Sequence, residues 1–241
     1  MAGNTAGKHT MRLSEIMQET PAIRIYRFVP VSGPLFEYQA GQFVIANIPD
    51  PAHPGKILRR SYSIASTPLK RDYLELCIKL SETGTTGPLW KNLKQDAELV
   101  IEGPYGRFIL ETQANKKLFL VGSGSGIAPL MCMLRTLVKE HAKNPVTLIY
   151  GFHHDDDFAY RKEILSYVSD NIRIKPVAST PDDGWGYATG HVQDVINTLA
   201  APDFSESLWY LCGPPAMVKD VAELLMKKAV PLENIKREIF E

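Results

Sequence analysis

Residues 118–130, Leu-Phe-Leu-Val-Gly-Ser-Gly-Ser-Gly-Ile-Ala-Pro-Leu, decide the fold of this chain. The first four are apolar, which is typical of a strand buried on both faces of a parallel sheet. Gly122, Gly124 and Gly126 follow, and residues without a Cβ suit a sharp turn whose backbone contacts a bulky anion. The apolar run at 127–138 predicts a helix. A strand, a glycine turn and a helix N-terminus together indicate a diphosphate site, although a tight turn without a ligand fits the same residues.

The overall composition argues against several classes of protein. The chain has 241 residues, enough for one large or two modest domains, and 44% are apolar and 22% charged, as in ordinary globular proteins. Basic and acidic residues number 27 each, so no positive surplus favours nucleic-acid binding. The apolar runs are too short for a membrane span, and the polar N-terminus lacks the apolar core of a signal peptide. We interpret residues 1–10 as a short disordered tail.

The three cysteines lie far apart in the sequence. Cys77, Cys132 and Cys212 form no C-x-x-C motif and no plant-type iron–sulfur loop, so we expect no metal site. An odd number of scattered thiols favours a reducing cytoplasm over secretion.

Residues 11–112 have the pattern of a small β-barrel. Residues 23–29, Ile-Arg-Ile-Tyr-Arg-Phe-Val, alternate with period two, as a half-buried strand does. Further strands are predicted at 42–48, 62–65, 73–79 and 98–101, with one short helix at 89–93. Short strands at this spacing, separated by turns, predict a closed antiparallel Greek-key barrel.

Two stretches of this region carry groups that suit a cofactor. Residues 59–65, Arg-Arg-Ser-Tyr-Ser-Ile-Ala, offer a charged fork for phosphate, an aromatic face and hydroxyl donors, although a surface strand with two solvated arginines fits the pattern as well. In residues 82–90, Glu-Thr-Gly-Thr-Thr-Gly-Pro-Leu-Trp, backbone and hydroxyl donors precede a short helix. That pattern indicates either an anion site or simply a capped helix.

Residues 113–241 alternate between strands and helices. The predicted strands are 118–121, 146–150, 172–177, 208–212 and 235–240, and the predicted helices are 127–138, 159–168, 192–199 and 215–228. This alternation predicts a doubly wound, Rossmann-like α/β domain with a parallel sheet. Ligands of such sheets bind at the carboxyl ends of the strands. We therefore expect the segments at 122–126, 151–154, 179–182 and 212–215 to line one rim.

Four short motifs occur in order along the chain. They are Arg60-Ser-Tyr-Ser63, Gly103-Pro-Tyr-Gly-Arg-Phe108, Gly124-Ser-Gly-Ile-Ala-Pro129 and Cys212-Gly-Pro-Pro215. In this order they resemble the flavin motif, the domain-joining segment, the nicotinamide-nucleotide loop and the late C-G-P-x motif of the ferredoxin–NADP⁺ reductase superfamily. The resemblance runs from about residue 12 to the end of the chain. It implies a FAD-binding barrel followed by an NAD-binding domain, with no fused iron–sulfur domain.

By this resemblance the barrel holds FAD tightly. Arg60 would bind the diphosphate, Tyr62 would lie against the isoalloxazine ring, and the Ser63 hydroxyl would hydrogen-bond near N5, which accepts the hydride. Further flavin contacts are implied for Ser61, Cys77, Ile78, Lys79, Gly84, Thr85, Thr86 and Gly87. Gly87 stands where the family has serine or threonine, so either Thr86 supplies that hydroxyl or the contact is made by backbone N–H alone.

The resemblance also implies how the second domain binds its nucleotide. The implied contacts are Gly124, Ser125, Gly126, His153, Ser179, Thr180, Cys212, Gly213 and Pro214. Cys212 would lie beside nicotinamide C4, although its position at a strand end fits a buried core cysteine as well. Phe240 would cover the flavin face that the nicotinamide reaches, or it completes the core.

The residues around the third rim segment favour NADH over NADPH. Relatives that use NADPH tend to have arginine where this chain has Thr180, and often a second arginine where it has His153. The carboxylates at 155–157 would repel an added phosphate, although they also fit a solvated loop that caps the next helix. His153, His154, Arg161 and Lys162 leave NADPH open.

These features together predict an enzyme. NADH would pass a hydride to FAD, and electrons would then leave for an external acceptor such as a ferredoxin, flavodoxin or oxygenase component, because the chain has no iron–sulfur cysteines of its own. The alternative is a flavin-holding electron-transfer subunit that works only within a larger redox complex.

Overall fold

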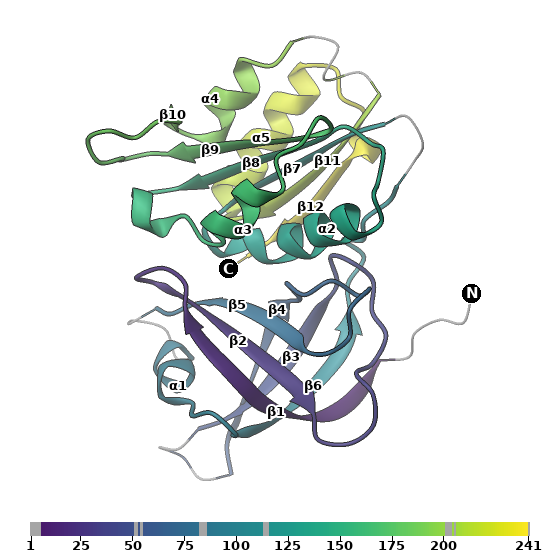
Figure 1. Cartoon of the computed structure of the whole chain (residues 1–241), viewed down its shortest axis with the longest axis vertical. Helices are drawn as coiled ribbons and strands as arrows, with labels where there is room; N and C mark the ends of the chain where they lie inside the picture. Colours follow the sequence, from purple (N-terminus) through teal and green to yellow (C-terminus); the bar gives the residue numbers. More distant parts are fainter. Residues whose placement is uncertain are drawn as a thin grey trace. The chain divides into compact units, whose positions relative to one another are not determined.

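The computed structural model describes residues 6–50, 53, 55–81, 86–112, 116–200, 204 and 206–240, and it divides into two compact units (Figure 1). The first unit comprises the described residues up to Leu110 together with Met131–Lys139. The second comprises Glu111–Leu130 and the described residues from Glu140 onward. The predicted boundary between residues 112 and 113 puts Met131–Lys139 in the second domain. By its contacts, this segment belongs to the first unit.

The first unit is a curled antiparallel sheet. Its elements are β1 (Gly7–Gln18), β2 (Ile23–Pro30), β3 (Phe43–Pro49), β4 (Ile57–Ser63), β5 (Leu74–Lys79), α1 (Gly87–Asn92) and β6 (Glu98–Tyr105). The strand order is β4-β3-β6-β1-β2-β5. The two end strands meet again, because Ile64 after β4 forms an antiparallel bridge with Leu76 of β5. This closure confirms the predicted antiparallel barrel.

Strand β1 begins within the residues predicted to be a disordered tail. It pairs with β6 from Gly7 opposite Gly103 to Arg12 opposite Glu98, and Lys8 Nζ lies 3.6 Å from Glu102 Oε1. The prediction of a tail is therefore wrong for residues 7–10, while residues 1–5 lie outside the described part of the chain. Polar residues are tolerated at the start of β1 because backbone pairing with β6 holds it in the sheet.

The second unit is a parallel α/β layer structure. Its strands are β7 (Lys117–Ser123), β8 (Val146–Phe152), β9 (Ile172–Ala178), β10 (Ala188–Thr189), β11 (Ser207–Gly213) and β12 (Ile235–Ile239). Its α-helices are the start of α2 (Ile127–Lys139), which continues into the first unit from Met131, and α3 (Arg161–Ser166), α4 (Val192–Asn197) and α5 (Pro215–Lys227). Its 3₁₀ turns are η1 (Gly124–Gly126), η2 (Asp155–Asp157) and η4 (Leu232–Asn234). The sheet order is β10-β9-β8-β7-β11-β12, with parallel pairing throughout. Among the described residues of this unit, the two-residue strand β10 was not predicted, and it lies within a turn-rich segment.

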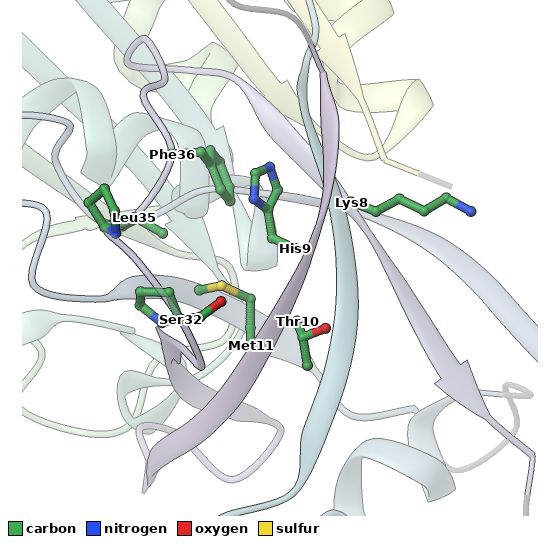
Figure 2. A pocket seen from close by; sticks show the side chains of 9 residues that line it. Lys8, His9, Thr10, Met11, Ser32, Leu35 and Phe36 are labelled. Carbon is green, nitrogen blue, oxygen red and sulfur yellow. The ribbon is translucent and has the colours of Figure 1, made fainter.

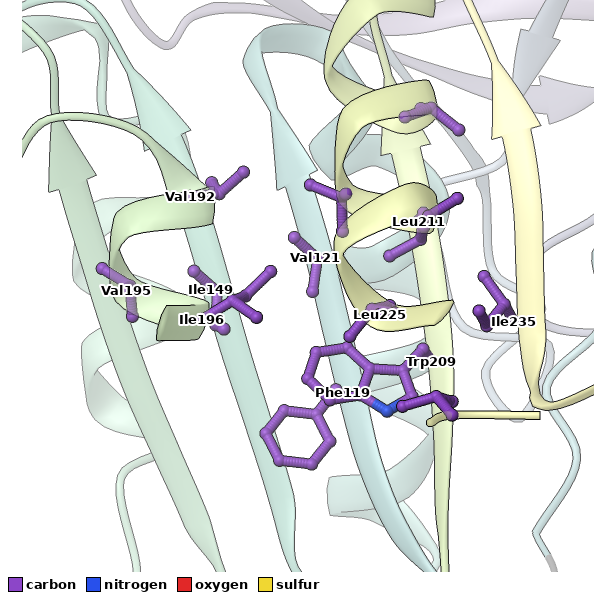
Figure 3. Packing of buried hydrophobic residues seen from close by; sticks show 14 of the residues in the cluster. Phe119, Val121, Ile149, Val192, Val195, Ile196, Trp209, Leu211, Leu225 and Ile235 are labelled. Carbon is purple, nitrogen blue, oxygen red and sulfur yellow. The ribbon is translucent and has the colours of Figure 1, made fainter. Parts of the chain in front are cut away.

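Helices cover both faces of this sheet, as a doubly wound fold requires. α4 and α5 lie on one face, and α3 and the start of α2 lie on the other (Figure 1). The core under α4 and α5 joins the strands to both helices (Figure 3). Within it, Phe119 stacks on Trp209 with ring centroids 4.0 Å apart, and Phe204 stacks on the same indole at 5.8 Å. The strand order reverses between β7 and β11, so the carboxyl ends of these two strands form the switch point where ligands of such sheets bind.

Candidate functional site

The predicted flavin motif lies on β4, at one end of the strand order of the first unit. Arg60 and Ser61 are exposed, Tyr62 is half-buried, and Ser63 is buried at the end of the strand. Because side chains alternate along a strand, Arg60 and Tyr62 share one face, and Ser61 and Ser63 share the other. The structure therefore brings the predicted cation and the predicted aromatic ring together on one face.

The two adjacent arginines of β4 have different surroundings. Arg59 Nη2 lies 2.6 Å from Glu102 Oε2, and the other oxygen of that carboxylate accepts from Asn47 at 3.2 Å. Burial would raise the pKa of Glu102, but the hydrogen bond from Asn47 and the charges of Arg59 and Lys8 lower it below its ordinary value. Arg60 donates to the backbone oxygen of Arg59. Both arginines are exposed, and Arg59 is the one that pairs with Glu102.

Helix α1 approaches the flavin motif from the side. The indole Nε1 of Trp90 donates to the Tyr62 hydroxyl at 2.7 Å, and the two rings meet edge to face with centroids 5.2 Å apart. Thr86 also hydrogen-bonds to that hydroxyl. Burial raises the pKa of Tyr62, and the two hydrogen bonds partly offset this shift.

The start of α1 explains why the chain departs from the family at Gly87. A Cβ on Gly87 would lie 1.9 Å from the backbone oxygen of Ser81, so only glycine fits. Thr86 occupies the N-cap position of α1, but its side chain makes no capping hydrogen bond to the helix. Its side chain hydrogen-bonds to Tyr62 instead. Gly84 and Thr85, two predicted contacts, lie outside the described residues.

The third group of predicted flavin contacts lies on β5, next to β4 at the closure of the sheet. Cys77 and Ile78 are buried and Lys79 is exposed. One edge of β5 pairs with β2. The other edge faces β4, and in the described residues the only bridge on that side joins Ile64, just after β4, to Leu76. Backbone groups of β5 therefore lie beside the strand that carries Tyr62.

The predicted nucleotide turn follows β7 in the second unit and forms η1. A Cβ on Gly126 would lie 2.3 Å from the Cys212 backbone oxygen, and one on Gly122 would lie 2.7 Å from Leu130 Cδ1. Gly124 has φ +54° and open space around the missing Cβ. The absence of a Cβ on Gly122 and Gly126 therefore lets the turn pack closely against its neighbours, Leu130 and the end of β11. Gly124 leaves its backbone accessible to a ligand.

The end of β11 meets this turn at the switch point. Cys212 is fully buried, and burial together with the nearby Glu238 carboxylate raises the pKa of its thiol well above the ordinary value. Gly213 follows at the start of the turn into α5, and its backbone oxygen accepts from the Phe240 N–H at 3.0 Å. Cys212, Gly213 and the glycine turn are thus brought together as predicted, with the half-buried Phe240 beside Gly213.

The second and third rim segments are joined by direct hydrogen bonds. His153 Nδ1 lies 3.0 Å from Ser179 Oγ, and His154 Nδ1 lies 2.9 Å from the Thr180 backbone oxygen. The Asp182 N–H donates to Asp155 Oδ1 at 3.2 Å. The expectation that residues 151–154 and 179–182 line one rim is confirmed.

The sequence did not single out a cluster of aromatic side chains beside these rim segments. Phe152, Phe158 and Trp185 pack together, and the Arg161 guanidinium lies 5.9 Å from the ring centres of both Phe158 and Trp185. The high aromatic content of residues 150–158 and 185–187 was the signal that could have revealed it.

A pocket of about 220 Å³ lies in the first unit between the start of β1 and residues 30–36 (Figure 2). None of the predicted site residues line it.

The described residues contain no group of three or more histidine, cysteine or acidic side chains arranged to hold a metal ion. No helix among them is long and apolar enough to cross a membrane.

Comparisons with known proteins match each unit to a domain family. The oxidoreductase FAD-binding domain matches residues 10–109, and the oxidoreductase NAD-binding domain matches residues 120–223. The chain is 28% identical to the glycine betaine monooxygenase reductase subunit of Chromohalobacter salexigens, over 98% of this chain and 65% of that protein. It is 29% identical to ferredoxin–NADP reductase B of Sorangium cellulosum, over 95% of this chain and 96% of that protein.

A solved structure shows the same arrangement of elements. The Amycolatopsis cytochrome P450 reductase GcoB matches with a TM-score of 0.88 at 26% identity, covering 100% of this chain and 72% of that one. The chain thus spans about two thirds of the length of the betaine monooxygenase relative, at 65%, and nearly all of the Sorangium reductase. With a FAD-binding domain on the curled antiparallel sheet and an NAD-binding domain on the parallel sheet, the chain belongs to the ferredoxin–NADP⁺ reductase superfamily.

Proposed function

We propose that this chain is a reductase that takes a hydride from NADH onto FAD and delivers electrons to an external redox protein. The observation that carries the proposal is the switch point of the second unit, where the glycine turn packs against Cys212 so closely that no Cβ fits on Gly126. A diphosphate on the turn and a nicotinamide beside Cys212 are two parts of one extended ligand. That arrangement suits a nicotinamide nucleotide better than a lone phosphate.

The residues of β4 fit FAD. Bound FAD would take up the electron pair of a hydride and release electrons singly, which a one-electron acceptor requires. We assign the exposed guanidinium of Arg60 to the diphosphate, because Arg60 shares one face of β4 with Tyr62. The Tyr62 ring would lie against the isoalloxazine, and the Ser63 hydroxyl would donate near its N5. Ser61 and the backbone of Cys77, Ile78 and Lys79 would complete the contacts.

The residues of the second unit would orient the nucleotide. Gly124, Ser125 and Gly126 would offer backbone N–H groups to its diphosphate at the start of α2. The Cys212 thiol stays protonated at neutral pH because burial and Glu238 raise its pKa, so it would act as a small neutral neighbour of nicotinamide C4. Gly213 and Pro214 would shape the same end of the pocket, and we assign Phe240 to covering the flavin until the nucleotide arrives.

We infer that NADH is preferred over NADPH. The third rim segment has Thr180 where a 2′-phosphate would need a cation, and Asp155, Asp156 and Asp157 follow the second. Asp155 is held close to the rim because its carboxylate accepts from the Asp182 N–H. His153 bonds Ser179 across the rim, so both side chains would face the ribose of the nucleotide.

The acceptor is proposed to be a protein such as a ferredoxin, a flavodoxin or an oxygenase component. Support comes from the relatives that are named reductase subunits or components of monooxygenases, including the propane 2-monooxygenase reductase component of Rhodococcus jostii. We also propose a cytoplasmic location, because Cys77, Cys132 and Cys212 are all buried free thiols. The subunit character of these relatives equally supports the second candidate, a flavin-holding electron-transfer subunit active only within a complex.

One experiment tests the proposal and separates the two candidates. The purified full chain is supplied with FAD and NADH, and the reduction of ferricyanide is followed. Rapid turnover would support a free-standing reductase. A yellow protein that NADH does not bleach would support the subunit instead, and a protein that binds no added FAD would overturn both.

A further inference from the structure

Trp90 is the residue on which helix α1 is anchored to the barrel. Its side chain is 1% exposed, and its ring packs against Tyr26 and Phe28 with centroids 4.8 and 6.2 Å away. The Tyr26 hydroxyl also donates to the backbone oxygen of Trp90 at 2.8 Å. Both the ring and the backbone of this residue are therefore fixed by the interior of the first unit.

From this fixed position the indole holds Tyr62 by its hydroxyl. The indole nitrogen can only donate, so Tyr62 accepts the 2.7 Å hydrogen bond from Trp90. The rings meet at 84°, with the edge of one against the face of the other. A ring held at its hydroxyl end and packed against a perpendicular ring has little freedom to tilt about χ2. Tyr62 has this restraint although its neighbours Arg60 and Ser61 on β4 are exposed.

We propose that Trp90 is a positioning residue for the flavin: it fixes the plane of the Tyr62 ring before FAD binds. The inference rests on the proposed function, in which Tyr62 lies against the isoalloxazine. A ring that is already ordered loses less conformational freedom when the ligand stacks on it, so FAD binds more tightly. Trp90 itself needs no contact with the flavin, because it acts through the Tyr62 hydroxyl.

The test compares FAD affinities in a double-mutant cycle. FAD is titrated into the flavin-free full chain and into Trp90→Phe, Tyr62→Phe and the double variant, and binding is followed by quenching of flavin fluorescence. Trp90→Phe keeps an aromatic ring between Tyr26 and Phe28 but removes the indole donor. We expect it to raise the Kd for FAD about three- to tenfold, the factor that corresponds to ordering one side chain on binding. Tyr62→Phe, which breaks the same bond from the other side, should raise the Kd by a similar factor.

The cycle also separates positioning from a general loss of structure. If Trp90 acts through the Tyr62 hydroxyl, Trp90→Phe has no further effect on Kd in the Tyr62→Phe background. A matched control is Trp209→Phe, which removes a buried indole hydrogen bond of equal length, 2.7 Å to Ser207 Oγ, in the second unit. It should leave the Kd for FAD unchanged.

Several outcomes would overturn the inference while leaving the proposed function intact. They are an unchanged Kd in Trp90→Phe, strictly additive effects in the cycle, or an equal loss of affinity in Trp209→Phe. If Trp90→Phe does not fold, an unchanged Kd in Tyr62→Phe alone overturns it. A wild-type chain that takes up no FAD would instead overturn the proposed function itself.

Discussion

Glu75 and Arg135 form a buried ion pair inside the first unit. Glu75 on β5 is 0% exposed, and Arg135 on α2 has its Nη1 2.6 Å from one carboxylate oxygen. The same Nη1 donates to the backbone oxygen of Ala65 at 2.8 Å. The second carboxylate oxygen lies 2.8 Å from Nε of Arg27, whose side chain is 26% exposed. Glu75 therefore has two cationic partners, of which only Arg27 reaches water appreciably.

We expect Arg135→Met to lower the free energy of unfolding of the first unit by about 3–4 kcal/mol. Removal of one partner from a buried ion pair costs about 3–5 kcal/mol, because the remaining charge is no longer compensated. Arg27 still pairs with Glu75, which brings this loss to the lower end of that range or slightly below it. The lost bond to Ala65 adds about 1 kcal/mol. Methionine keeps the length of the apolar stem, so little packing is lost.

Native-state hydrogen exchange on peptides from β2 and β5 measures this free energy for the first unit by itself. The matched control is Arg12→Met, which removes an ion pair of similar length, 2.8 Å to Asp96, from the same unit. That pair is exposed on both sides, at 47% and 66%, so its loss should stay under about 1 kcal/mol. Equal losses in the two variants would refute the reasoning, because the larger loss expected for Arg135→Met depends on the burial of its pair with Glu75.

Three further substitutions test the two sites. Thr180→Arg should raise the ratio of kcat/KM for NADPH over NADH about tenfold, by pairing with the 2′-phosphate, and an unchanged ratio would place the discrimination elsewhere. Ser63→Ala should slow flavin reduction in stopped-flow about tenfold with near-normal flavin content, as expected for one lost hydrogen bond, and unchanged kinetics would remove Ser63 from the mechanism. Gly87→Ser should lower the free energy of unfolding by roughly 2 kcal/mol or more, seen as a lower thermal midpoint, because its Cβ would lie 1.9 Å from the Ser81 oxygen; an unchanged midpoint would contradict that geometry.

Much of the second unit could be predicted from local signals. The run of apolar residues before Gly122 and the glycines after it are read from neighbouring positions, and the parallel sheet then follows from alternation of strands and helices. The meeting of Gly126 with Cys212 could be predicted as well, because the turn that holds Gly126 follows β7 and Cys212 lies near the carboxyl end of β11 in the same parallel sheet. In the described residues, the two-residue β10 and the ends of the short helices α3 and α4 were not predicted, since their few hydrogen bonds leave no periodic pattern.

The first unit was less predictable because its decisive contacts join distant residues. No pattern in Arg59-Arg60 tells which arginine pairs with Glu102, because Glu102 lies on β6, two strands away in the sheet. Residues 7–10 look like a polar tail because their partner β6 lies far along the chain. The ion pair between Glu75 and Arg135 is hidden for the same reason, as a single charge in an apolar helix gives no sign of its partner.

Gly87 stands where the family has serine or threonine, and its place at the start of α1 gives a structural reason for the glycine. From the sequence, the missing hydroxyl put a flavin contact in question. In the structure, the close approach of Gly87 to Ser81 brings α1 against the barrel, where Trp90 and Thr86 both bond the Tyr62 hydroxyl. A side chain at position 87 would push this helix away and release Tyr62. The glycine at position 87 is therefore part of what holds the Tyr62 hydroxyl against Trp90.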